Sequence, residues 1–518
     1  MGWSNTWLRI MKVKGTKVDD EQGCWTLCQK CHGRGKKNKG LRKKTRLRYQ
    51  RELEQFEKSK SEGAAPTRPK SHLDTCLVCN GSGLIHAAIQ PLVDTENYPH
   101  LAIIGGGIGG VALAVACLHR GIPFTLYERD SGFDTRSQGY GLTLQQASKA
   151  IEGLGIFSLQ EGVISTRHVV HTTEGKVIGE WGIRKLEQSV ATRPPKRRNV
   201  HIARQSLRLA LLEQLDGQDV VQWGHQLVGL KEREGEGVDL SFQVETDGKS
   251  EMISAHADLV VGADGIYSAV RRLLIGEEAS PLCYLGCIVI LGICPLADLY
   301  DEGDEGLAGG VFQHSALLDS ATVFQTANGN ERIYIMPYAS DSVMWQLSFP
   351  MLEKEAKALS AKGAEALKAE AYRRCQWHDP IPQIIAATLA SQVSGYPVYD
   401  RTPLEPELLA KGAQVTLIGD AAHPMSPFKG QGANQALLDA LALARGITQG
   451  CRPLSHWREA GLRDSVLTEF EAEMLQRSAR KVKDSADAAQ FLHSDIVLHE
   501  GDEPRGRVLL KKRGNEQQ

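Results

Sequence analysis

The fold is decided by the segment 101-LAIIGGGIGGVALAVACLHRGIPFTLYE-128. Four apolar residues make a short strand candidate, and a glycine-rich turn follows at once. An apolar stretch of helical length then ends at Gly121 and Pro123, residue types that typically end a helix. A second strand candidate, 124–127, leads to Glu128. Strand, turn, helix and strand in this order predict a parallel βαβ unit of the doubly wound α/β class.

The glycine-rich turn matches the dinucleotide-binding pattern GxGxxG. The first glycine permits a tight turn, the second lets the backbone approach a pyrophosphate, and the third lets helix pack on strand. The phosphates then lie at a helix N-terminus, where free N–H groups and the helix dipole stabilise negative charge. An acidic residue at the end of the second strand accepts hydrogen bonds from ribose hydroxyls. The cofactor-binding candidates here are Gly105, Gly107, Gly109, Gly110, Glu128 and the adjacent Arg129.

The glycine pattern alone does not separate FAD from NAD, and a plain structural turn is its alternative. Two later segments distinguish between the two nucleotides. One is 258-DLVVGADGIYSAVR-271 and the other is 417-LIGDAAHPMSPFKGQGAN-434. With these three motifs in this order, the chain resembles the single-component FAD-dependent aromatic-hydroxylase family over about residues 99–492. That family includes p-hydroxybenzoate and salicylate hydroxylases and the tetracycline-inactivating monooxygenases, to which the layout is most similar.

The resemblance implies a fold and an activity. The expected fold is α/β, with a doubly wound, Rossmann-like FAD-binding domain, an inserted mixed or antiparallel sheet for substrate, and a long C-terminal helix. The expected reaction is hydroxylation of an aromatic or polyketide-like small molecule with NAD(P)H and O2, through a flavin hydroperoxide. NAD(P)H would bind transiently, and no side chain is expected to act as catalytic acid or base. The alternatives are an FAD-dependent reductase or dehydrogenase without oxygen insertion, and a binding adaptor built on the N-terminal module.

The resemblance also assigns residues to the cofactor. Asp420 would hold the ribityl hydroxyls and Asp264 would touch the flavin and the nicotinamide path; a helix cap and a strand-ending turn are the respective alternatives. Backbone N–H groups before the last motif's helix would face the flavin and stabilise negative charge there. Two arginines match cofactor-side arginines of the family, with solvated surface charges as the alternative. The residues carried over are Arg136, Arg204, Asp264, Asp420, Pro427, Gly430, Gln431, Gly432 and Asn434.

Residues 281–350 alternate in polarity and are rich in aromatic side chains, which predicts antiparallel strands. The resemblance implies that the part 310–350 roofs the flavin. Some of these side chains are expected to line the substrate pocket, with the core of the sheet as the alternative for each. His423 is expected to be a hydrogen-bonded structural residue. The pocket candidates are Phe312, Phe324, Met336, Tyr338, Trp345 and Phe349.

Two short repeats mark the N-terminal region: 28-CQKCHGRG-35 and 76-CLVCNGSG-83. Each places two thiolates on one turn, and two such turns make a tetrahedral four-cysteine zinc site. The repeats resemble the CxxCxGxG units of the DnaJ cysteine-rich region, which has four of them, so one zinc is expected and chaperone activity is not carried over. The predicted ligands are Cys28, Cys31, Cys76 and Cys79, with free thiols as the alternative.

The N-terminal region is also basic. Residues 1–95 carry 19 Lys+Arg against 9 Asp+Glu, which leaves about −11 on the remainder of a chain whose net charge is −1. A basic head on an acidic body indicates separate modules. We expect the head's charged helix to be solvated or to dock on the body, with a nucleic acid or a partner protein as alternative partners.

The expected division of the chain is 1–95, zinc-binding basic module; 96–280, first part of the FAD-binding domain; 281–395, substrate-binding sheet; 396–450, second part of the FAD-binding domain; and 451–518, C-terminal helical region. Paired CxxC cysteines and the absence of an apolar signal segment favour a reducing, cytoplasmic location without a membrane span. A small-molecule substrate and O2 are the expected partners. No pattern in the sequence indicates an oligomeric state or separates NADH from NADPH.

Overall fold

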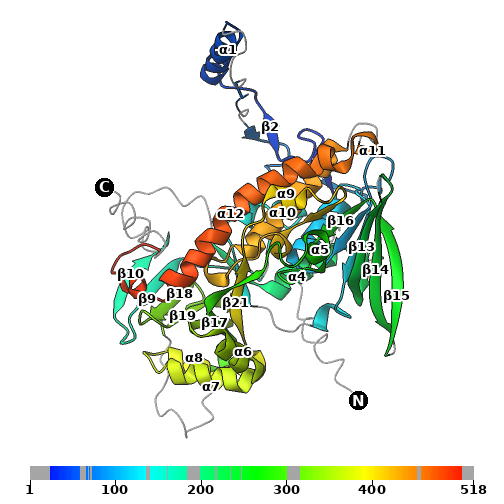
Figure 1. Ribbon diagram of the computed structural model, residues 1–518. Helices are drawn as coiled ribbons and strands as arrows, with labels where there is room; N and C mark the ends of the chain where they lie inside the picture. Colours follow the sequence, from blue (N-terminus) through cyan, green and yellow to red (C-terminus); the bar gives the residue numbers. More distant parts are fainter. Residues whose placement is uncertain are drawn as a thin grey trace.

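The computed structural model of the 518-residue chain describes residues 24–58, 66–67, 69, 73–135, 140–159, 161–183, 199–215, 219–233, 235–246, 248–299, 315–451 and 457–504. Arg136 and Phe312, two residues singled out from the sequence, lie outside this part of the chain. Figure 1 shows two sheet-and-helix bodies side by side, with a small N-terminal module extending from one of them.

Five parallel strands form the first body, in the order β12-β6-β5-β16-β22. All side chains of β5 and β16 are buried because both faces of the sheet are covered. Helix α2 (Ile108–Leu118) is apolar nearly all round because it packs between this sheet, α4 (Arg204–Leu212) and α10 (Gly432–Gly450). The predicted βαβ unit is therefore confirmed. The strands are β5 Leu101–Ile104, β6 Phe124–Glu128, β12 Val221–Trp223, β16 Leu259–Gly262 and β22 Val415–Leu417.

An antiparallel sheet covers the other face of the parallel strands. It consists of β13 (His225–Arg233), β14 (Gly237–Thr246) and β15 (Lys249–Ala257), which contact β6, β16 and β5 respectively. The ring of Phe242 stacks on that of Tyr127 at 4.3 Å between centroids. This packing buries the apolar side of β14 and fixes the end of β6, whose last residue is Glu128.

The second body is a seven-stranded sheet in the order β10-β9-β18-β19-β20-β17-β21. β9 and β18 are parallel and all other neighbours are antiparallel, so the predicted mixed sheet is confirmed. It takes β9 and β10 from a segment well before the predicted antiparallel region. The strands are β9 Arg167–His171, β10 Val177–Trp181, β17 Leu282–Pro295, β18 Thr322–Ala327, β19 Arg332–Ala339, β20 Ser342–Pro350 and β21 Val393–Arg401.

The two faces of this sheet have different neighbours. Because side chains alternate along a strand, Trp345, Leu347 and Phe349 of β20 point into a core shared with α6 (Glu353–Ala361), α7 (Ala364–Arg374) and α8 (Ile381–Ala387). Met344 and Gln346 point the other way and line a cavity. The three helices lie on the far side of the sheet from the parallel strands in Figure 1. The open face of the sheet is thus turned toward the first body.

The long C-terminal helix α12 (Thr468–Phe491) ties the two bodies together. It contacts α10 in the first body, β17 in the second, and the turn Pro427–Lys429 between them. Its last residue, Phe491, and the following Leu492 reach the cavity. No helix in the described part of the chain has the length and apolar character to cross a membrane.

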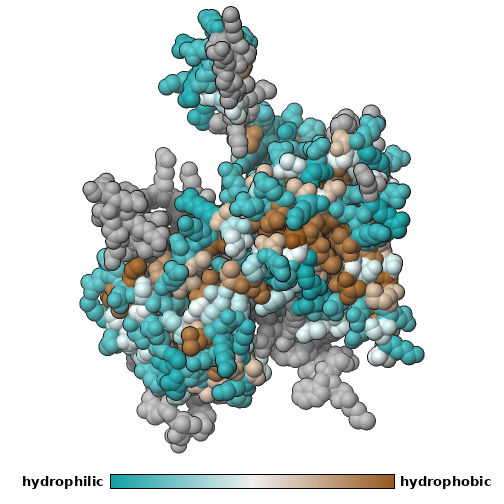
Figure 2. Space-filling view, viewed as in Figure 1, coloured by the Kyte–Doolittle hydropathy of each residue, from teal (hydrophilic) through white to brown (hydrophobic). Residues whose placement is uncertain are grey.

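The N-terminal module consists of two small β-ribbons and a helix. β1 (Cys24–Leu27) pairs with β4 (Leu84–Ala87), β2 (Lys36–Asn38) pairs with β3 (Leu73–Thr75), and α1 is Lys43–Lys58. Helix α1 has no buried residue and extends away from the body, and Figure 2 shows its surface as largely hydrophilic. Of the two expectations for this helix, the structure agrees with a solvated helix and not with one that docks on the body.

The base of the module, in contrast, is attached to α10. The guanidinium of Arg445 donates from Nε to the carbonyl of Gly33 and from Nη2 to that of Ser82, both at 3.2 Å. Trp25 packs on Phe157 of the body at 4.5 Å between ring centroids. Each cysteine turn thus contributes one carbonyl to the same arginine of the first body.

Candidate active site

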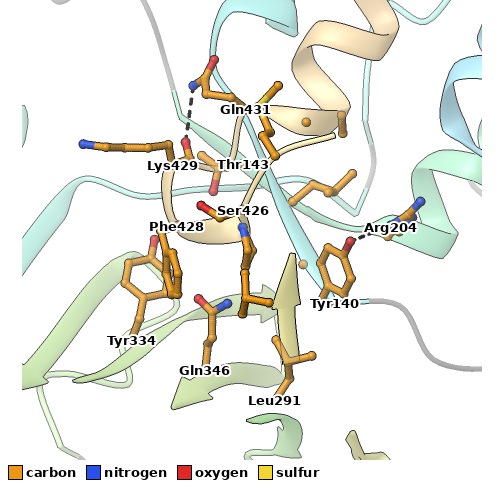
Figure 3. A pocket seen from close by; sticks show the side chains of 18 of the residues that line it. Tyr140, Thr143, Arg204, Leu291, Tyr334, Gln346, Ser426, Phe428, Lys429 and Gln431 are labelled. Atoms are coloured by element: carbon orange, nitrogen blue, oxygen red, sulfur yellow. Dashed lines mark hydrogen bonds between the residues drawn. The ribbon is translucent and has the colours of Figure 1, made fainter. Parts of the chain in front are cut away.

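One cavity of about 820 Å³ runs from the glycine-rich turn, past the start of α10, to the open face of the seven-stranded sheet. Figure 3 shows its central part, where Tyr140, Phe428, Tyr334 and Gln346 converge from different elements. The cavity lies at the carboxyl ends of β5 and β22, where doubly wound folds bind nucleotides. At the turn the cavity is lined mainly by backbone atoms of glycines, and at the sheet it is lined mainly by side chains.

Close packing requires glycine at two positions of the turn, Gly105 and Gly110. Gly105 has φ +109°, and a Cβ there would lie 2.6 Å from the carbonyl oxygen of Ala263. A Cβ at Gly110 would lie 1.9 Å from the carbonyl oxygen of Gly105. A Cβ at Gly107 would meet no atom within 4 Å, and Gly107 and Gly109 both line the cavity. The turn therefore leaves an open cradle at the N-terminus of α2, which fits a pyrophosphate.

Glu128 closes the back of this turn. Its Oε2 accepts a hydrogen bond from the amide of Gly106 at 2.6 Å and its Oε1 accepts one from Asp130 at 3.0 Å. Arg208 donates from Nε to the carbonyl of Gly106 at 2.7 Å. Sequence reasoning missed Arg208, although it lies four residues after Arg204 and so on the same face of α4. The side chain of Arg129 is largely exposed and does not line the cavity.

Arg204 and Asp420 lie on the cavity wall between the two ends. Arg204 donates from Nη1 to the hydroxyl of Tyr140 at 2.7 Å (Figure 3), a partner that the sequence did not suggest. The pKa of Arg204 is raised by the charges of Tyr140 and Asp420, against the effect of burial. Burial raises the pKa of Asp420, and the positive charge of Arg204 opposes this shift. Asp420 forms no hydrogen bond within the described chain, so its oxygens are available to a ligand's hydroxyls.

The loop before α10 is held rigidly. Asn434 accepts hydrogen bonds from the amides of Gln145 and Ala147 and donates to the carbonyls of Thr143 and Gly430, at 2.9–3.1 Å. It therefore positions the loop and does not itself line the cavity. The residues of this loop and of the first turn of α10 that line the cavity include Pro427, Phe428, Lys429, Gly430, Gln431, Gly432 and Ala433. The first N–H groups of α10 consequently face the cavity, as an anion site at a helix N-terminus requires.

Two titratable residues of the motifs, Asp264 and His423, form hydrogen bonds within the protein. The carboxylate of Asp264 accepts from the hydroxyl of Ser268 and from the amides of Ala269 and Val270, so it caps α5 (Ala269–Ile275). Its neighbours Ala263 and Gly265 line the cavity, but Asp264 does not. His423 bonds the buried Asp439 at 2.7 Å, in agreement with the structural role expected for it.

The sheet end of the cavity is formed by alternate residues of β19 and β20 together with α12. Of the pocket candidates, Phe324 and Met336 line it. Trp345 and Phe349 belong to the core on the opposite face, and Tyr338 packs near Met336 without lining the cavity. Sequence reasoning missed its polar residues, among them His168, Gln325, Arg332, Tyr334, Gln346 and Lys429.

The four predicted cysteine ligands come together in the N-terminal module. Their sulfur atoms all lie within 4.8 Å of one another and all four side chains are buried. The amides of Gly35 and Gly83 each donate to a sulfur, of Cys31 and Cys79, at 3.3 Å. This is the donor set of a closed four-thiolate zinc site, in which backbone N–H groups also donate to the sulfurs.

A parallel sheet with a dinucleotide cradle, joined by a cavity to a second sheet, is typical of a protein that binds a dinucleotide beside a second ligand. Residues 99–466 match the FAD binding domain family, to which the chain therefore belongs. Among curated proteins, the chain is 29% identical over 351 residues to an aurachin C monooxygenase/isomerase of Stigmatella aurantiaca, covering 67% of this chain and 80% of that one. It is 28% identical over 353 residues to a 3-amino-4-hydroxybenzoate 2-monooxygenase of Streptomyces platensis, covering 68% and 80%.

Solved structures show the same fold. The Klebsiella pneumoniae protein HpxO, complexed with FAD and uric acid, superposes with a TM-score of 0.59 at 22% identity, covering 80% of this chain and 92% of that one. A tetracycline destructase superposes with a TM-score of 0.51 at 18% identity, covering 82% and 96%. The chain is an FAD-dependent monooxygenase, and the predicted enzyme class is confirmed.

Proposed function

We propose that the chain hydroxylates a small aromatic molecule, with NAD(P)H as electron donor and O2 as the source of the oxygen atom. The observation that supports this most strongly is the single cavity that connects the dinucleotide cradle with a polar and aromatic sheet face. The names of the relatives are consistent with it, since one acts on an aminohydroxybenzoate.

The residues around the cradle are suited to FAD. We assign the pyrophosphate to Gly107–Gly109 and the N-terminus of α2, and the ribityl chain to Arg204 and Asp420. Glu128 does not line the cavity, and we assign the adenosine ribose to it from its position at the end of β6, directly behind the glycine-rich turn. The backbone of Gly430–Gly432 would meet the flavin ring. When bound, FAD takes electrons from the nicotinamide and makes O2 reactive toward the substrate.

The chain's own contribution at the sheet end is to bind and orient the substrate and to exclude water. We assign no catalytic acid or base. Burial lowers the pKa of His168 to about 4, so this cavity residue is neutral at pH 7. Burial raises the pKa of Tyr334 to about 12, so its hydroxyl keeps its proton.

The test is reduction of the protein's flavin by NADH or NADPH without O2, across a panel of aromatic compounds, followed by admission of O2 and mass analysis. We expect one compound to accelerate reduction and to gain one oxygen atom. A matched pair of variants checks the site: Asp420→Asn should lose FAD, and Arg129→Ala, on the exposed neighbour of Glu128, should keep it. Flavin reduction that is indifferent to every compound, with no oxygenated product, contradicts the proposal.

We further propose one structural zinc ion on Cys28, Cys31, Cys76 and Cys79. The four buried sulfurs and their two N–H donors support it. Metal analysis should give one zinc per chain, and Cys79→Ser should abolish it. Cys283→Ser, at a partly exposed cysteine far along the chain, is the control and should leave the zinc content unchanged. A zinc content near zero in protein purified without chelator contradicts the assignment.

A further inference from the structure

Helix α1 carries a cationic surface and extends away from the body (Figure 1). Residues 36–51, from β2 to the middle of this helix, include nine Lys and Arg and no Asp or Glu. All nine are exposed except Lys37, which is half-buried. Within the described part of the chain, two of them form ion pairs. Lys39 pairs with Asp74 at 2.5 Å, and Arg48 pairs with Glu52 at 2.7 Å. The five that belong to α1 are Lys43, Lys44, Arg46, Arg48 and Arg51.

The order of charges along α1 opposes the stability of the free helix. Acidic residues stabilise the first turn of a helix and basic residues the last. The first turn of α1 has no acidic residue, and its three glutamates all lie in the second half; only Lys58 has the favoured position. In the pair Arg48–Glu52 the basic residue comes first, which is the weaker orientation. Because α1 has no buried residue, burial does not offset this cost, whereas an anion bound along the first half would remove it.

The exposed surface of α1 favours a polyanion over a lipid surface. A helix that lies in a membrane interface needs a broad apolar face. Leu47 is the one large apolar side chain of α1 that is exposed, at 44%, and the other three are partly covered. With 3.6 residues per turn, the five cations spread over about 200° of the helix circumference. They therefore project to both sides of the helix rather than to one plane.

Cations on both sides of a helix match a groove that has a phosphate strand on each side. The major groove of double-stranded DNA is about 12 Å wide and admits an α-helix, whereas that of double-stranded RNA is too narrow. The charge of the body limits the contact to this helix and the adjoining ribbon, because the chain outside residues 1–95 carries about −11 and repels a polyanion.

We propose that α1 binds double-stranded DNA in the major groove, with its cations on the phosphates of the two strands. Lys and Arg contacts to phosphates carry no sequence information, so the binding is independent of base sequence. This activity is separate from the hydroxylation proposed for the cavity, and it gives the N-terminal module a function of its own.

The test is titration of the FAD-loaded full chain into a short fluorescent DNA duplex, read by anisotropy at several salt concentrations. Five phosphate contacts predict that the logarithm of the association constant falls with the logarithm of salt with a slope of about −4 to −5. Changing Lys43, Lys44 and Arg51 together to Gln should reduce this slope by about 1 for each residue and weaken binding by about tenfold or more. These changes remove positive charge from the first half of α1, so they do not weaken the helix.

The matched control changes three exposed lysines of the body, Lys354, Lys362 and Lys411, to Gln, and should leave DNA binding unchanged. The proposal is overturned if the duplex does not bind, if the α1 variant keeps the affinity and the salt slope, or if the control loses as much as the α1 variant. It is also overturned if double-stranded RNA or phosphatidylserine vesicles bind more tightly than DNA. FAD content measures the folding of each variant, and the absence of NAD(P)H keeps the result independent of hydroxylation.

Discussion

Replacing Gly107 by alanine is expected to weaken FAD binding without weakening the fold. A Cβ at this position meets no atom within 4 Å, and its φ of −74° suits alanine. Alanine restricts the unfolded chain, a gain of about 0.4–1 kcal/mol, and is a poorer helix N-cap than glycine, a loss of roughly 0.5 kcal/mol. The free energy of unfolding of the FAD-free protein should therefore change by less than about 0.5 kcal/mol.

The effect on FAD binding should be much larger. The added methyl projects into the cradle where the pyrophosphate is assigned and holds the phosphate away from the first N–H groups of α2. Loss of one charge-assisted hydrogen bond costs about 1.5–3 kcal/mol, or about 10- to 100-fold in the dissociation constant. Fluorescence titration of the FAD-free protein with FAD measures this directly.

Gly110→Ala is the matched comparison three residues along the same helix. Its Cβ would lie 1.9 Å from a backbone oxygen, which no side-chain rotation relieves. This variant should lose about 3 kcal/mol of stability or more, because the helix must move off the strand. The reasoning is refuted if Gly107→Ala binds FAD as tightly as the unaltered protein, or if it loses as much stability in urea as Gly110→Ala.

Three further predictions concern the frame around the site. Asn434→Ala should lower the free energy of unfolding by about 2–4 kcal/mol in urea, because it removes four hydrogen bonds; Asn330→Ala, on an exposed turn, should change it by less than about 0.5 kcal/mol. Burial raises the pKa of Asp400 from 3.8 to about 6, so the folded protein binds a proton at this carboxyl more tightly than the unfolded chain does. The stability that this proton contributes is therefore present below about pH 4 and is lost as the pH rises through about 6. Asp400→Asn should therefore stabilise the protein by about 1 kcal/mol at pH 8, after allowance for solvent screening, and by much less at pH 4; an equal gain at both values would exclude this cause. Removal of zinc by a chelator should lower the melting temperature of the body, because the two cysteine turns are bonded to Arg445 of α10. Arg445→Ala should make that melting temperature insensitive to the chelator. A chelator effect that persists in Arg445→Ala would show that other contacts connect the module to the body.

The parts of the fold that depend on short-range pattern could be predicted. The strand, turn and helix at 101–128 are specified by apolar runs and by glycines that the local packing requires. The cysteine pairs were equally readable, because each CxxC turn brings its own two sulfurs together. In both cases the deciding contacts lie within a few residues or in a repeated unit.

The lining of the cavity could not be predicted, because it depends on how distant strands pair. The sequence does not show that β9 and β10 join the later strands, nor which face of β20 meets the helices. The sequence therefore predicts Trp345 as a pocket residue, although it lies in the core, and it does not indicate Arg332, which lines the cavity. Hydrogen bonding sets a similar limit: Asn434 and Asp264 occupy motif positions, but their partners in the structure are backbone amides and carbonyls and a serine hydroxyl.

The measurement that tests the account most directly is a turnover experiment with O2 labelled with heavy oxygen. The FAD-loaded protein is given NADH or NADPH and the aromatic compound that most accelerates flavin reduction, and the product is analysed by mass. We predict one labelled oxygen atom in the product for each NAD(P)H consumed. Consumption of NAD(P)H with all the label in hydrogen peroxide, for every compound that accelerates flavin reduction, would contradict the account.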